Sequence, residues 1–326
     1  MKEKTKRGAL GAKGKLKRTA VRAKEKLKRT AVKMNQNKFY YLLILPAVVL
    51  LFIFAYKPMY GVILAFKKYS FRKGIWDSPW CGLDNFKTIF AEEQFWVAFR
   101  NTLIINLLKL ITGFPAPIIL AVMLNAIRRK TVRSSVQTIL YLPHFLSWIV
   151  ISSIIFALLD NDGPIYSLLS LMGVKNTNIL SDGNVVLGLV VFSDLWKEVG
   201  WGAIIYLAAL SGINPELYEA ADLDGANTLR KFWHITIPGI LPTISIMLVL
   251  RVGGLVGGNF EQIYSIYNEL VYDKVDIIDT FLYRYGINQG RFAEGTAIGL
   301  FTNVINIILL LIANFSVKLF GGEGLY

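Results

Sequence analysis

Long apolar blocks alternate with shorter polar segments along this chain. The first block, Phe39–Tyr56, contains no charged residue, and the later blocks approach the roughly 20 residues that a helix needs to cross a bilayer. Ten-residue stretches of alternating polarity, which a membrane β-barrel would require, do not recur. The pattern therefore predicts an all-α membrane protein with six transmembrane helices. We expect these helices at about 39–58, 103–127, 138–159, 185–211, 239–258 and 296–317.

The composition supports a membrane protein over a soluble one. Hydrophobic residues make up 54% and charged residues 18% of the 326 residues, against about 45–50% and about 25% in ordinary globular chains. The apolar excess is concentrated in the six blocks, so it predicts membrane spans and not one large soluble core. The single cysteine, Cys81, excludes an intrachain disulfide.

The positive charge belongs to the N-terminus. Residues 1–38 hold 15 Lys and Arg against Glu3 and Glu25, a net +13, so the other residues carry about +1 of the total of +14. A basic folded surface for nucleic acid is therefore not expected. The sequence Lys-Leu-Lys-Arg-Thr-Ala-Val occurs at 15–21 and again at 26–32, a shift of 11 residues that keeps one helical face. Such a tail either lies as a helix on the anionic inner leaflet or stays in solvent and only fixes the topology.

Basic residues in the short loops set the expected orientation. With the tail 1–38 in the cytoplasm, the loop 128–133 with its four basic residues and the C-terminus are also cytoplasmic. The segments 57–102, 160–184 and 259–295 then lie outside. The chain thus divides into a basic cytoplasmic tail, 1–38, and a membrane domain, 39–326.

The polar segment 212–238, between the fourth and fifth spans, predicts a compact helical loop on the cytoplasmic side. Asn214-Pro215-Glu216 is typical of a helix start, because Asn caps, Pro fits the first turn and Glu suits its positive end. Gly225 is expected to end or kink this helix. A second short helix is expected from Asn227 to His234, and Pro238 is expected to restart the chain as it re-enters the membrane.

The loop contains Glu219-Ala220-Ala221, then Gly225, and Ile235-x-Ile237-Pro238. With these residues at this spacing, it resembles the cytoplasmic EAA loop of the membrane subunit of binding-protein-dependent ABC importers. One departure is Ile237, where the family usually has Leu. The resemblance implies a type I importer permease whose loop docks in a cleft of a partner ATPase. The implied coupling residues are Glu219, Ala220, Ala221, Asp224, Gly225, Ile235 and Pro238.

Four other segments are informative: Leu45-Pro46-Ala47, Lys57-Pro58-Met59-Tyr60-Gly61, Gly82-Leu83-Asp84-Asn85-Phe86 and Tyr141-Leu142-Pro143-His144. They resemble segments of the carbohydrate-uptake permeases, and within them the oligosaccharide and polysaccharide-fragment branch related to the maltose-type permease. This resemblance implies import of a sugar by alternating access in a bacterial cytoplasmic membrane. It also implies a second homologous permease, two ATP-binding subunits and an extracellular solute-binding protein as partners.

Polar residues inside the predicted spans are costly in hydrocarbon and tend to face a cavity or a partner. Asp194, Lys197 and Glu198 share one helical face, since they stand at i, i+3 and i+4. Hydrogen-bonding groups beside an aromatic ring suit a sugar, and a net positive set favours an acidic sugar such as a uronate. The same groups alternatively pair with one another to hold the helices together. The candidate substrate-pathway residues are Asn106, Lys109, Asp194, Trp196, Lys197, Arg251, Asn259, Asn303 and Asn306.

The chain lacks the motifs of several other functions. No Gly-x-x-x-x-Gly-Lys-Ser/Thr loop occurs, so ATP and Mg²⁺ are expected on the partner subunits and no cofactor on this chain. Two histidines and one cysteine predict no metal site, and His144 is expected to be a packing residue. No catalytic constellation supports a membrane-embedded enzyme. An ATP-independent secondary transporter or channel would predict inverted repeats, which are not apparent, and a non-sugar solute stays an alternative within the importer class.

Overall fold

The computed structural model describes residues 37–160, 163–171, 179–319, 321 and 324, and the described residues form helices and no strand. The chain divides into two compact units, Met1–Gly61 and Val62–Tyr326, and we call the second the main unit. Most of the predicted tail 1–38 lies outside the described residues. The α-helices are α2 Lys38–Leu51, α3 Lys57–Met59, α4 Gly74–Asp77, α5 Asp84–Ala91, α6 Glu93–Gly113, α7 Pro115–Ala126, α8 Lys130–Tyr141, α9 Trp148–Leu159, α10 Pro164–Leu171, α11 Gly183–Leu210, α12 Pro215–Leu223, α13 Thr228–Lys231, α14 Ile237–Gly253, α15 Phe260–Ile266, α16 Tyr272–Val275, α17 Ile278–Phe281 and α18 Phe292–Leu319.

Within the described residues, five helical stretches are long and apolar enough to cross a membrane. They are Lys38–Phe66, Glu93–Ala126, Trp148–Leu168, Thr228–Gly253 and Phe292–Leu319. The helix α11 covers the remaining predicted span, 185–211, and has 28 residues, but it carries Asp194, Lys197 and Glu198. The described residues therefore confirm an all-α membrane fold, and the count of six spans stays a prediction.

The predicted span 138–159 is wrong as one helix. The helix α8 ends at Tyr141, a 3₁₀ turn follows at Leu142–Phe145, and α9 begins at Trp148. Pro143 has no N–H to donate within a helix, so it favours a break. Ser147 then caps α9, since its hydroxyl accepts a hydrogen bond from the Val150 N–H at 3.3 Å.

The second predicted span starts too late. The helix α6 begins at Glu93 rather than at 103, and Phe95 and Ala98 in its first turns are buried. Arg100 interrupts the apolar pattern in the sequence but not the helix. Its guanidinium leaves the apolar face and donates to the Asp273 carbonyl at 2.9 Å. The predicted outer segment 57–102 is therefore largely helical.

The helix after the polar loop does not stop at His234. It begins after Asn227, as expected, but α13 continues through a π-helical turn, Phe232–Thr236, directly into α14. The Ile237 N–H reaches the Phe232 carbonyl, five residues back, so the helix widens just before Pro238, whose ring would crowd an ordinary turn. Pro238 therefore lies inside a continuous helix and does not restart the chain. The π-helical turn Phe52–Tyr56 precedes Pro58 in the same way.

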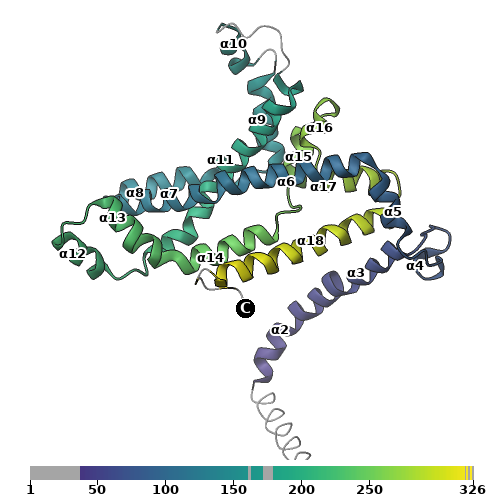
Figure 1. The fold of residues 1–326 in the computed structure, drawn as a ribbon, viewed down its shortest axis with the longest axis horizontal. Coiled ribbons are helices and arrows are strands. Elements are labelled where there is room, and N and C mark those ends of the chain that lie inside the picture. The colour runs from purple at the N-terminus through teal and green to yellow at the C-terminus, as the bar shows by residue number, and fades with distance from the viewer. Residues whose placement is uncertain (1–36, 161–162, 172–178, 320, 322–323, 325–326) are drawn as a thin grey trace, which may run out of the picture. The chain divides into compact units, whose positions relative to one another are not determined.

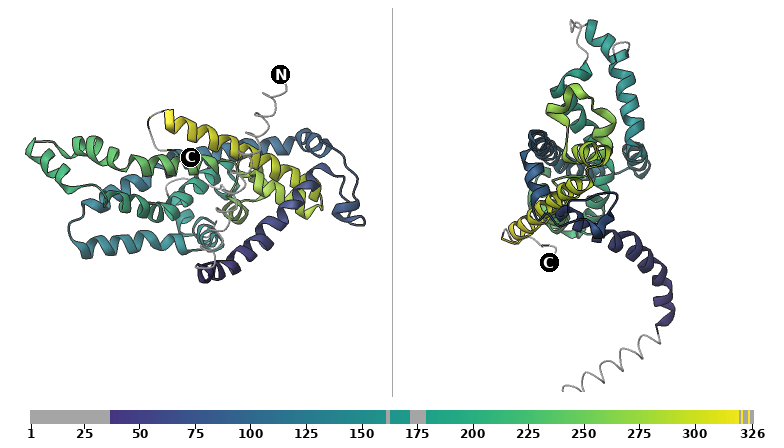
Figure 2. Two further views of the ribbon diagram at one scale, coloured as in Figure 1. Left: turned by 90° about the horizontal axis from the view of Figure 1, so that it is seen from below. Right: turned by 90° about the vertical axis from the view of Figure 1, so that its right-hand side faces the viewer.

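The helix α11 is central to the main unit and packs against α6, α7 and α14 (Figure 1). One stripe of its surface is buried, and this stripe includes Asp194 and Lys197, so both charges face protein rather than lipid. The crossing with α8 is close, because a Cβ at Gly200 would lie 2.0 Å from the Leu140 carbonyl oxygen. The helices α14 and α18 run side by side (Figures 1 and 2).

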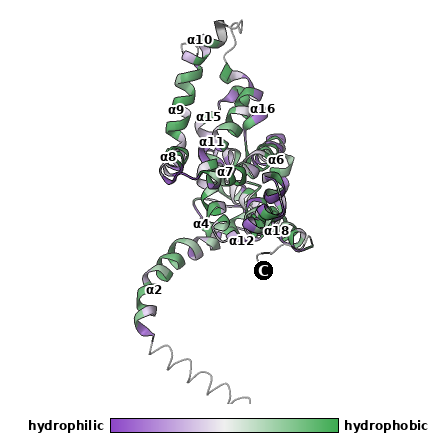
Figure 3. Ribbon diagram, turned by 90° about the vertical axis from the view of Figure 1, so that its left-hand side faces the viewer, coloured by the Kyte–Doolittle hydropathy of each residue, from purple (hydrophilic) through white to green (hydrophobic). Residues whose placement is uncertain are grey.

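The main unit has two distinct ends (Figures 1 and 2). The short helix α12 lies at one end, and α4 and α5 lie at the other. The long helices α6, α7, α14 and α18 run between these ends (Figure 1). Apolar side chains cover most of α9, as its hydropathy colouring shows (Figure 3). This arrangement separates the polar loop 212–238 from the predicted outer segments.

Candidate functional site

The helix α12 is closed at both ends by local hydrogen bonds. At its start, the Asn214 side chain accepts the Glu216 N–H at 3.1 Å. At its end, the Ala226 N–H reaches the Ala221 carbonyl at 2.8 Å, and the Gly225 N–H reaches the Asp222 carbonyl at 3.1 Å. This pair is a Schellman motif, which requires the left-handed backbone of Gly225, whose φ is 72°. The predicted helix start and the ending at Gly225 are both confirmed.

Two side-chain contacts fix α12 to the helix that follows. Lys231 Nζ lies 2.6 Å from Asp222 Oδ1, and the Tyr218 hydroxyl lies 2.9 Å from Thr236 Oγ1. The rest of α12 is uncovered, since it contains no buried residue and Leu223 is 91% exposed. Of the seven predicted coupling residues, Ala221 and Ile235 are partly buried and the other five are exposed. The loop is thus a compact helical protrusion, and no described residue of the chain covers the outer surface of α12.

A buried ion network joins α6, α11 and α14. The Lys109 ammonium lies 3.0 Å from Asp194 Oδ1, and the Lys109 side chain is only 2% exposed. Arg251 Nη2 lies 3.6 Å from the other oxygen, Asp194 Oδ2, and the Arg251 side chain is 46% exposed. One carboxylate therefore stands between two cations, one enclosed and one at a surface.

Amides complete the network. Lys109 Nζ also donates to the Asn259 side-chain oxygen at 2.7 Å and to the Gln262 side-chain oxygen. Asn259 Nδ2 donates to Asn106 Oδ1 at 2.6 Å, and Asn106 Nδ2 donates to the Leu255 carbonyl at 2.7 Å. All three Lys109 hydrogens thus have acceptors, which is the condition for a buried ammonium. The sequence did not identify Gln262, although its spacing of three residues from Asn259 places both on one helical face.

Lys197 faces away from this network. Its ammonium donates to the carbonyls of His144 and Leu146, both at 2.6 Å, and so closes the turn between α8 and α9. His144 Nδ1 lies 3.0 Å from Glu198 Oε2, and its ring stacks on Trp201 with centroids 4.4 Å apart. His144 is therefore a packing residue, as the sequence suggested.

The remaining candidate substrate-pathway residues, Trp196, Asn303 and Asn306, also lie outside the ion network. Asn306 holds the backbone of Val256, since its side chain accepts the Val256 N–H at 2.9 Å and donates to its carbonyl at 2.7 Å. Trp196 is 43% exposed and Asn303 is exposed, and neither joins the ion network. The structure thus brings together Asn106, Lys109, Asp194, Arg251 and Asn259 but leaves Trp196, Lys197, Asn303 and Asn306 outside the cluster.

A pocket opens beside Arg251. It has a volume of about 220 Å³, and its walls come from α6, α7, α11 and α14. Asp194 and Glu198 line it together with the rings of Trp201 and Tyr206, two residues that the sequence did not identify. We call this the Arg251 pocket. It combines a half-exposed guanidinium, carboxylates and aromatic rings, which suits a polar ligand with apolar faces.

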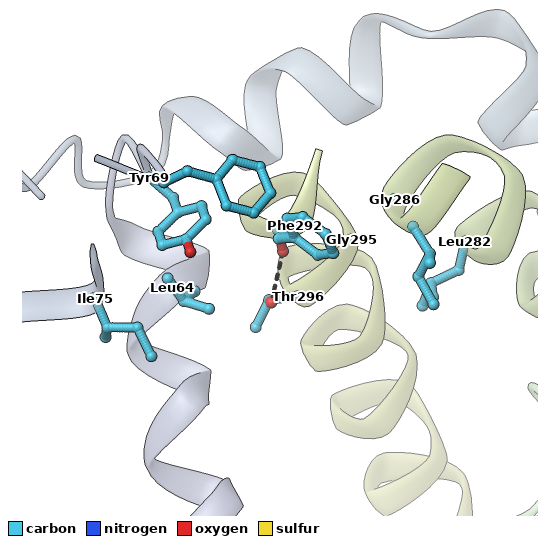
Figure 4. Close-up of a pocket in the computed structure, with 10 residues that line it drawn as sticks. Leu64, Tyr69, Ile75, Leu282, Gly286, Phe292, Gly295 and Thr296 are labelled. Atoms are coloured by element: carbon cyan, nitrogen blue, oxygen red, sulfur yellow. Dashed lines mark hydrogen bonds between the residues drawn. The ribbon is translucent and has the colours of Figure 1, made fainter. Parts of the chain in front are cut away.

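A second pocket, of about 400 Å³, is lined by residues that include Ile75 of α4 and Phe292 of α18 (Figure 4). Tyr69 and Phe292 contact edge to face with centroids 6.2 Å apart, and Leu64 and Ile75 continue the apolar wall. These residues come from the first predicted outer segment, 57–102, and from the beginning of α18.

Comparison with known proteins identifies the class. Residues 113–321 match the family described as the inner membrane component of binding-protein-dependent transport systems, and the chain belongs to this family. It is therefore a multi-pass membrane protein and a transport subunit rather than an enzyme.

Two curated relatives come from Bacillus subtilis (strain 168). Protein LplB is 42% identical over 90% of this chain and 92% of its own length. The polygalacturonan/rhamnogalacturonan transport system permease protein YteP is 40% identical over the same shares of the two chains.

A solved structure shares the fold. It is a chain of a bacterial ABC transporter involved in the import of the acidic polysaccharide alginate. The likeness has a TM-score of 0.82 at 37% sequence identity, over 89% of this chain and 98% of that one. A second structure, of the bacterial alginate ABC transporter with an alginate pentasaccharide-bound periplasmic protein, gives a TM-score of 0.82 at 36% identity over 90% and 98%.

Proposed function

We propose that this chain is the permease subunit of an ATP-driven importer for oligosaccharides that carry carboxylates. Two relatives support this substrate class by their names, one with polygalacturonan and one with the acidic polysaccharide alginate. Membership of a binding-protein-dependent family favours an importer over a secondary transporter or a channel. The observation that carries the proposal is the half-exposed guanidinium of Arg251 in an aromatic-lined pocket.

One group of the Arg251 pocket favours an anion. The pocket lining holds the guanidinium of Arg251 together with the carboxylates of Asp194 and Glu198, while Lys109 and Lys197 stand outside the lining. The Lys109 ammonium donates its hydrogen bonds to side-chain oxygens, and the Lys197 ammonium donates to backbone carbonyls, all within the chain. Arg251 alone of the three presents free donors to the pocket, because its 3.6 Å contact with Asp194 is longer than a hydrogen bond. A guanidinium binds a carboxylate through two parallel hydrogen bonds, so a uronate fits this position.

The loop around α12 supplies the coupling. We infer that Glu219, Ala220, Ala221, Asp224 and Gly225 dock on one of two partner ATPases, with Ile235 and Pro238 at the helix that continues into α14. Because α13 and α14 are continuous, a push on α12 reaches Arg251 along one rigid element. Alternating access then needs a second permease, and ATP and Mg²⁺ stay on the ATPases.

The orientation follows from the same arrangement. We infer that the end with α12 and both chain termini are cytoplasmic, in the cytoplasmic membrane of a bacterium. The solute-binding protein then docks on the segments 57–102 and 259–295. The position of α4 and α5 at the end away from α12 supports this orientation (Figure 1).

The test uses the importer reconstituted with its partner permease, ATPases and binding protein. Galactotriose and trigalacturonate are suitable probes, because they differ only at C6. We expect ATP-dependent uptake of trigalacturonate, and we expect Arg251→Gln to lower it about tenfold, which corresponds to about 1.4 kcal/mol. Arg251→Lys keeps the positive charge but loses the two parallel N–H donors of the guanidinium, so its trigalacturonate uptake should lie between those of the unsubstituted importer and of Arg251→Gln.

The matched control is Lys130→Gln, which removes an exposed cation at the start of α8, outside the pocket and outside the proposed docking segments. An equal loss for both sugars in Arg251→Gln would contradict the acidic substrate. Uptake that needs no ATP would contradict the importer.

A further inference from the structure

A third pocket lies between α9 and α15 and shares no lining residue with the Arg251 pocket. Its volume is about 580 Å³. The rings of Trp148, Phe260 and Tyr264 line it together with serine hydroxyls and the Glu261 carboxylate. One wall is therefore a candidate membrane span, and the other is the short helix α15 that follows α14.

The two faces of α15 do different things. Gln262, Ile263 and Ile266 are buried on one face, and Gln262 Nε2 donates to the Val190 carbonyl at 2.7 Å and to Ser193 Oγ at 3.0 Å. This face fixes α15 to α11 and, through Lys109, to the ion network. The opposite face carries Phe260, Glu261, Tyr264 and Ser265 into the pocket. The pocket wall is thus held in place before any ligand arrives.

The two rings of α15 that line the pocket belong to a larger aromatic cluster. Phe260 and Tyr264 stack with centroids 5.0 Å apart and planes 19° apart, and Tyr283 contacts both rings at 5.2 and 5.3 Å. The row continues from Tyr264 to Tyr267 at 5.9 Å. Flat rings that stay partly exposed suit the C–H faces of pyranose rings, since Tyr264 remains 47% exposed.

The polar groups of this pocket accept hydrogen bonds. The hydroxyls of Ser152 and Ser153 donate to the Ile149 carbonyl at 2.9 and 2.8 Å, and that of Ser265 donates to the Glu261 carbonyl at 2.6 Å. Their oxygens keep acceptor capacity. The Glu261 carboxylate forms no ion pair with any of the described residues. Such a wall matches a ligand rich in O–H donors and repels a carboxylate.

We propose that this pocket is a second sugar subsite, which binds an uncharged pyranose unit of the oligosaccharide whose uronate unit reaches Arg251. This inference rests on the proposed function and adds to it that the substrate contains neutral as well as acidic units. The two pockets differ in their charged groups, because the Arg251 pocket presents a guanidinium beside two carboxylates, whereas this pocket presents a carboxylate and no cation among its lining residues.

Thiol protection in the assembled importer tests the subsite directly. In a Cys81→Ser background, Ser153→Cys places a thiol in the pocket, and Ser135→Cys places a matched thiol on the exposed surface of α8. We expect galactotriose to slow maleimide labelling of Ser153→Cys severalfold and to leave Ser135→Cys unchanged. Trigalacturonate should protect less, and Glu261→Gln should raise its protection.

A ring substitution gives a second, independent readout. Tyr264→Ala should raise the half-saturating concentration of galactotriose for protection about tenfold, whereas Tyr264→Phe should keep most of the protection. Phe315→Ala is the control, because it removes a ring that is 65% exposed on α18 and outside the pocket. Co-purification with the partner subunits shows that each variant assembles.

The outcomes separate the two proposals. Absence of galactotriose protection at concentrations that saturate uptake overturns the subsite and leaves the Arg251 effect intact. Equal protection by both sugars with no response to Glu261→Gln also overturns it. In the converse outcome, Arg251→Gln lowers the uptake of both sugars equally while galactotriose still protects Ser153→Cys. That result would contradict the acidic substrate and leave the subsite intact.

Discussion

Two lysine–aspartate pairs in the main unit differ sharply in their surroundings. In the ion network, Lys109 and Asp194 lie 3.0 Å apart with side chains 2% and 12% exposed. In the loop around α12, Lys231 and Asp222 lie 2.6 Å apart with side chains 21% and 62% exposed. The shorter pair is the more exposed one, and for surface pairs screening and side-chain entropy leave an ion pair worth about 0–1 kcal/mol.

The difference shows how the chain assigns its polar groups. The buried network satisfies every donor of Lys109 within the chain, so it fixes α6, α11 and α15 relative to one another. The loop around α12 is held by its own backbone and by two side-chain contacts to the helix that follows, and its outer face stays uncovered. One region therefore contributes rigidity, and the other offers a surface for a partner.

The largest expected effect is in the buried network. Lys109→Met removes the nearer cation and leaves Asp194 with only the 3.6 Å contact to Arg251. Breaking a buried pair from one side costs about 3–5 kcal/mol, because the other charge stays buried. We expect a loss of that size in the free energy of unfolding, measured by denaturant titration of the detergent-solubilised protein.

The double variant Lys109→Met/Asp194→Leu separates charge from volume. Removing both charges should recover much of the loss, since apolar replacements of buried pairs are often neutral. If the double variant is less stable than Lys109→Met alone, the network does not act as a charge-compensated unit.

A smaller effect is expected at the end of α12. Gly225→Val forces a β-branched residue to a φ of 72°, which costs about 1–2 kcal/mol. A Cβ at this position would meet no atom within 4 Å, so we expect the cost to come from backbone strain. We expect faster hydrogen exchange in 215–226 and weaker stimulation of ATP hydrolysis by the sugar-loaded binding protein.

Gly225→Asn is the matched control, because Asn tolerates the left-handed region. It should behave nearly as the unsubstituted chain. Equal damage by Asn and Val would mean that the space around Gly225, and not its backbone conformation, matters to a partner.

Loss of the cap at the start of α13 should lower the stability of this helical turn by about 1 kcal/mol. Asn227 Oδ1 accepts the Arg230 N–H at 2.8 Å, and a cap of this kind is worth about that amount. Asn227→Ala should raise hydrogen exchange at 228–231, whereas Asn227→Ser should restore protection. No change in exchange for Asn227→Ala would show that tertiary contacts, and not the cap, hold this turn.

The smallest effect is expected for the exposed pair. Lys231→Met should lower the free energy of unfolding by less than about 1 kcal/mol, in contrast to Lys109→Met. Salt should abolish the effect of Lys231→Met and leave that of Lys109→Met largely unchanged. Equal losses in the two variants would remove the distinction between the two regions.

Local features were predictable where neighbours in the sequence decide them. The cap by Asn214 and the stop at Gly225 depend on residues within a few positions, so both predictions are confirmed. The boundaries of α6 and of α9 were not predictable from hydropathy. Arg100 interrupts the apolar pattern, so hydropathy places the start of α6 too late, although the Arg100 side chain points to the Asp273 carbonyl and the helix continues. Pro143 and Ser147 divide an uncharged run that hydropathy treats as one span.

The candidate site was predictable only as a set of residue types. The sequence identified Asn106, Lys109, Asp194, Arg251 and Asn259 but not their pairing, and it placed Lys197 beside Asp194 although the two bind different partners. Gln262 and Trp201 were missed, since an amide and a ring outside a charged cluster give no signal of their own.

The amino-acid sequence by itself determined the all-α membrane fold class, the closed ends of α12 and the family, because these depend on local pattern and on motif spacing. Only the tertiary structure decided which cation is enclosed and which faces a pocket. Lys109 and Arg251 are both cations within apolar blocks, and their difference arises from the packing of α6 and α15 around one ammonium while the guanidinium stays 46% exposed.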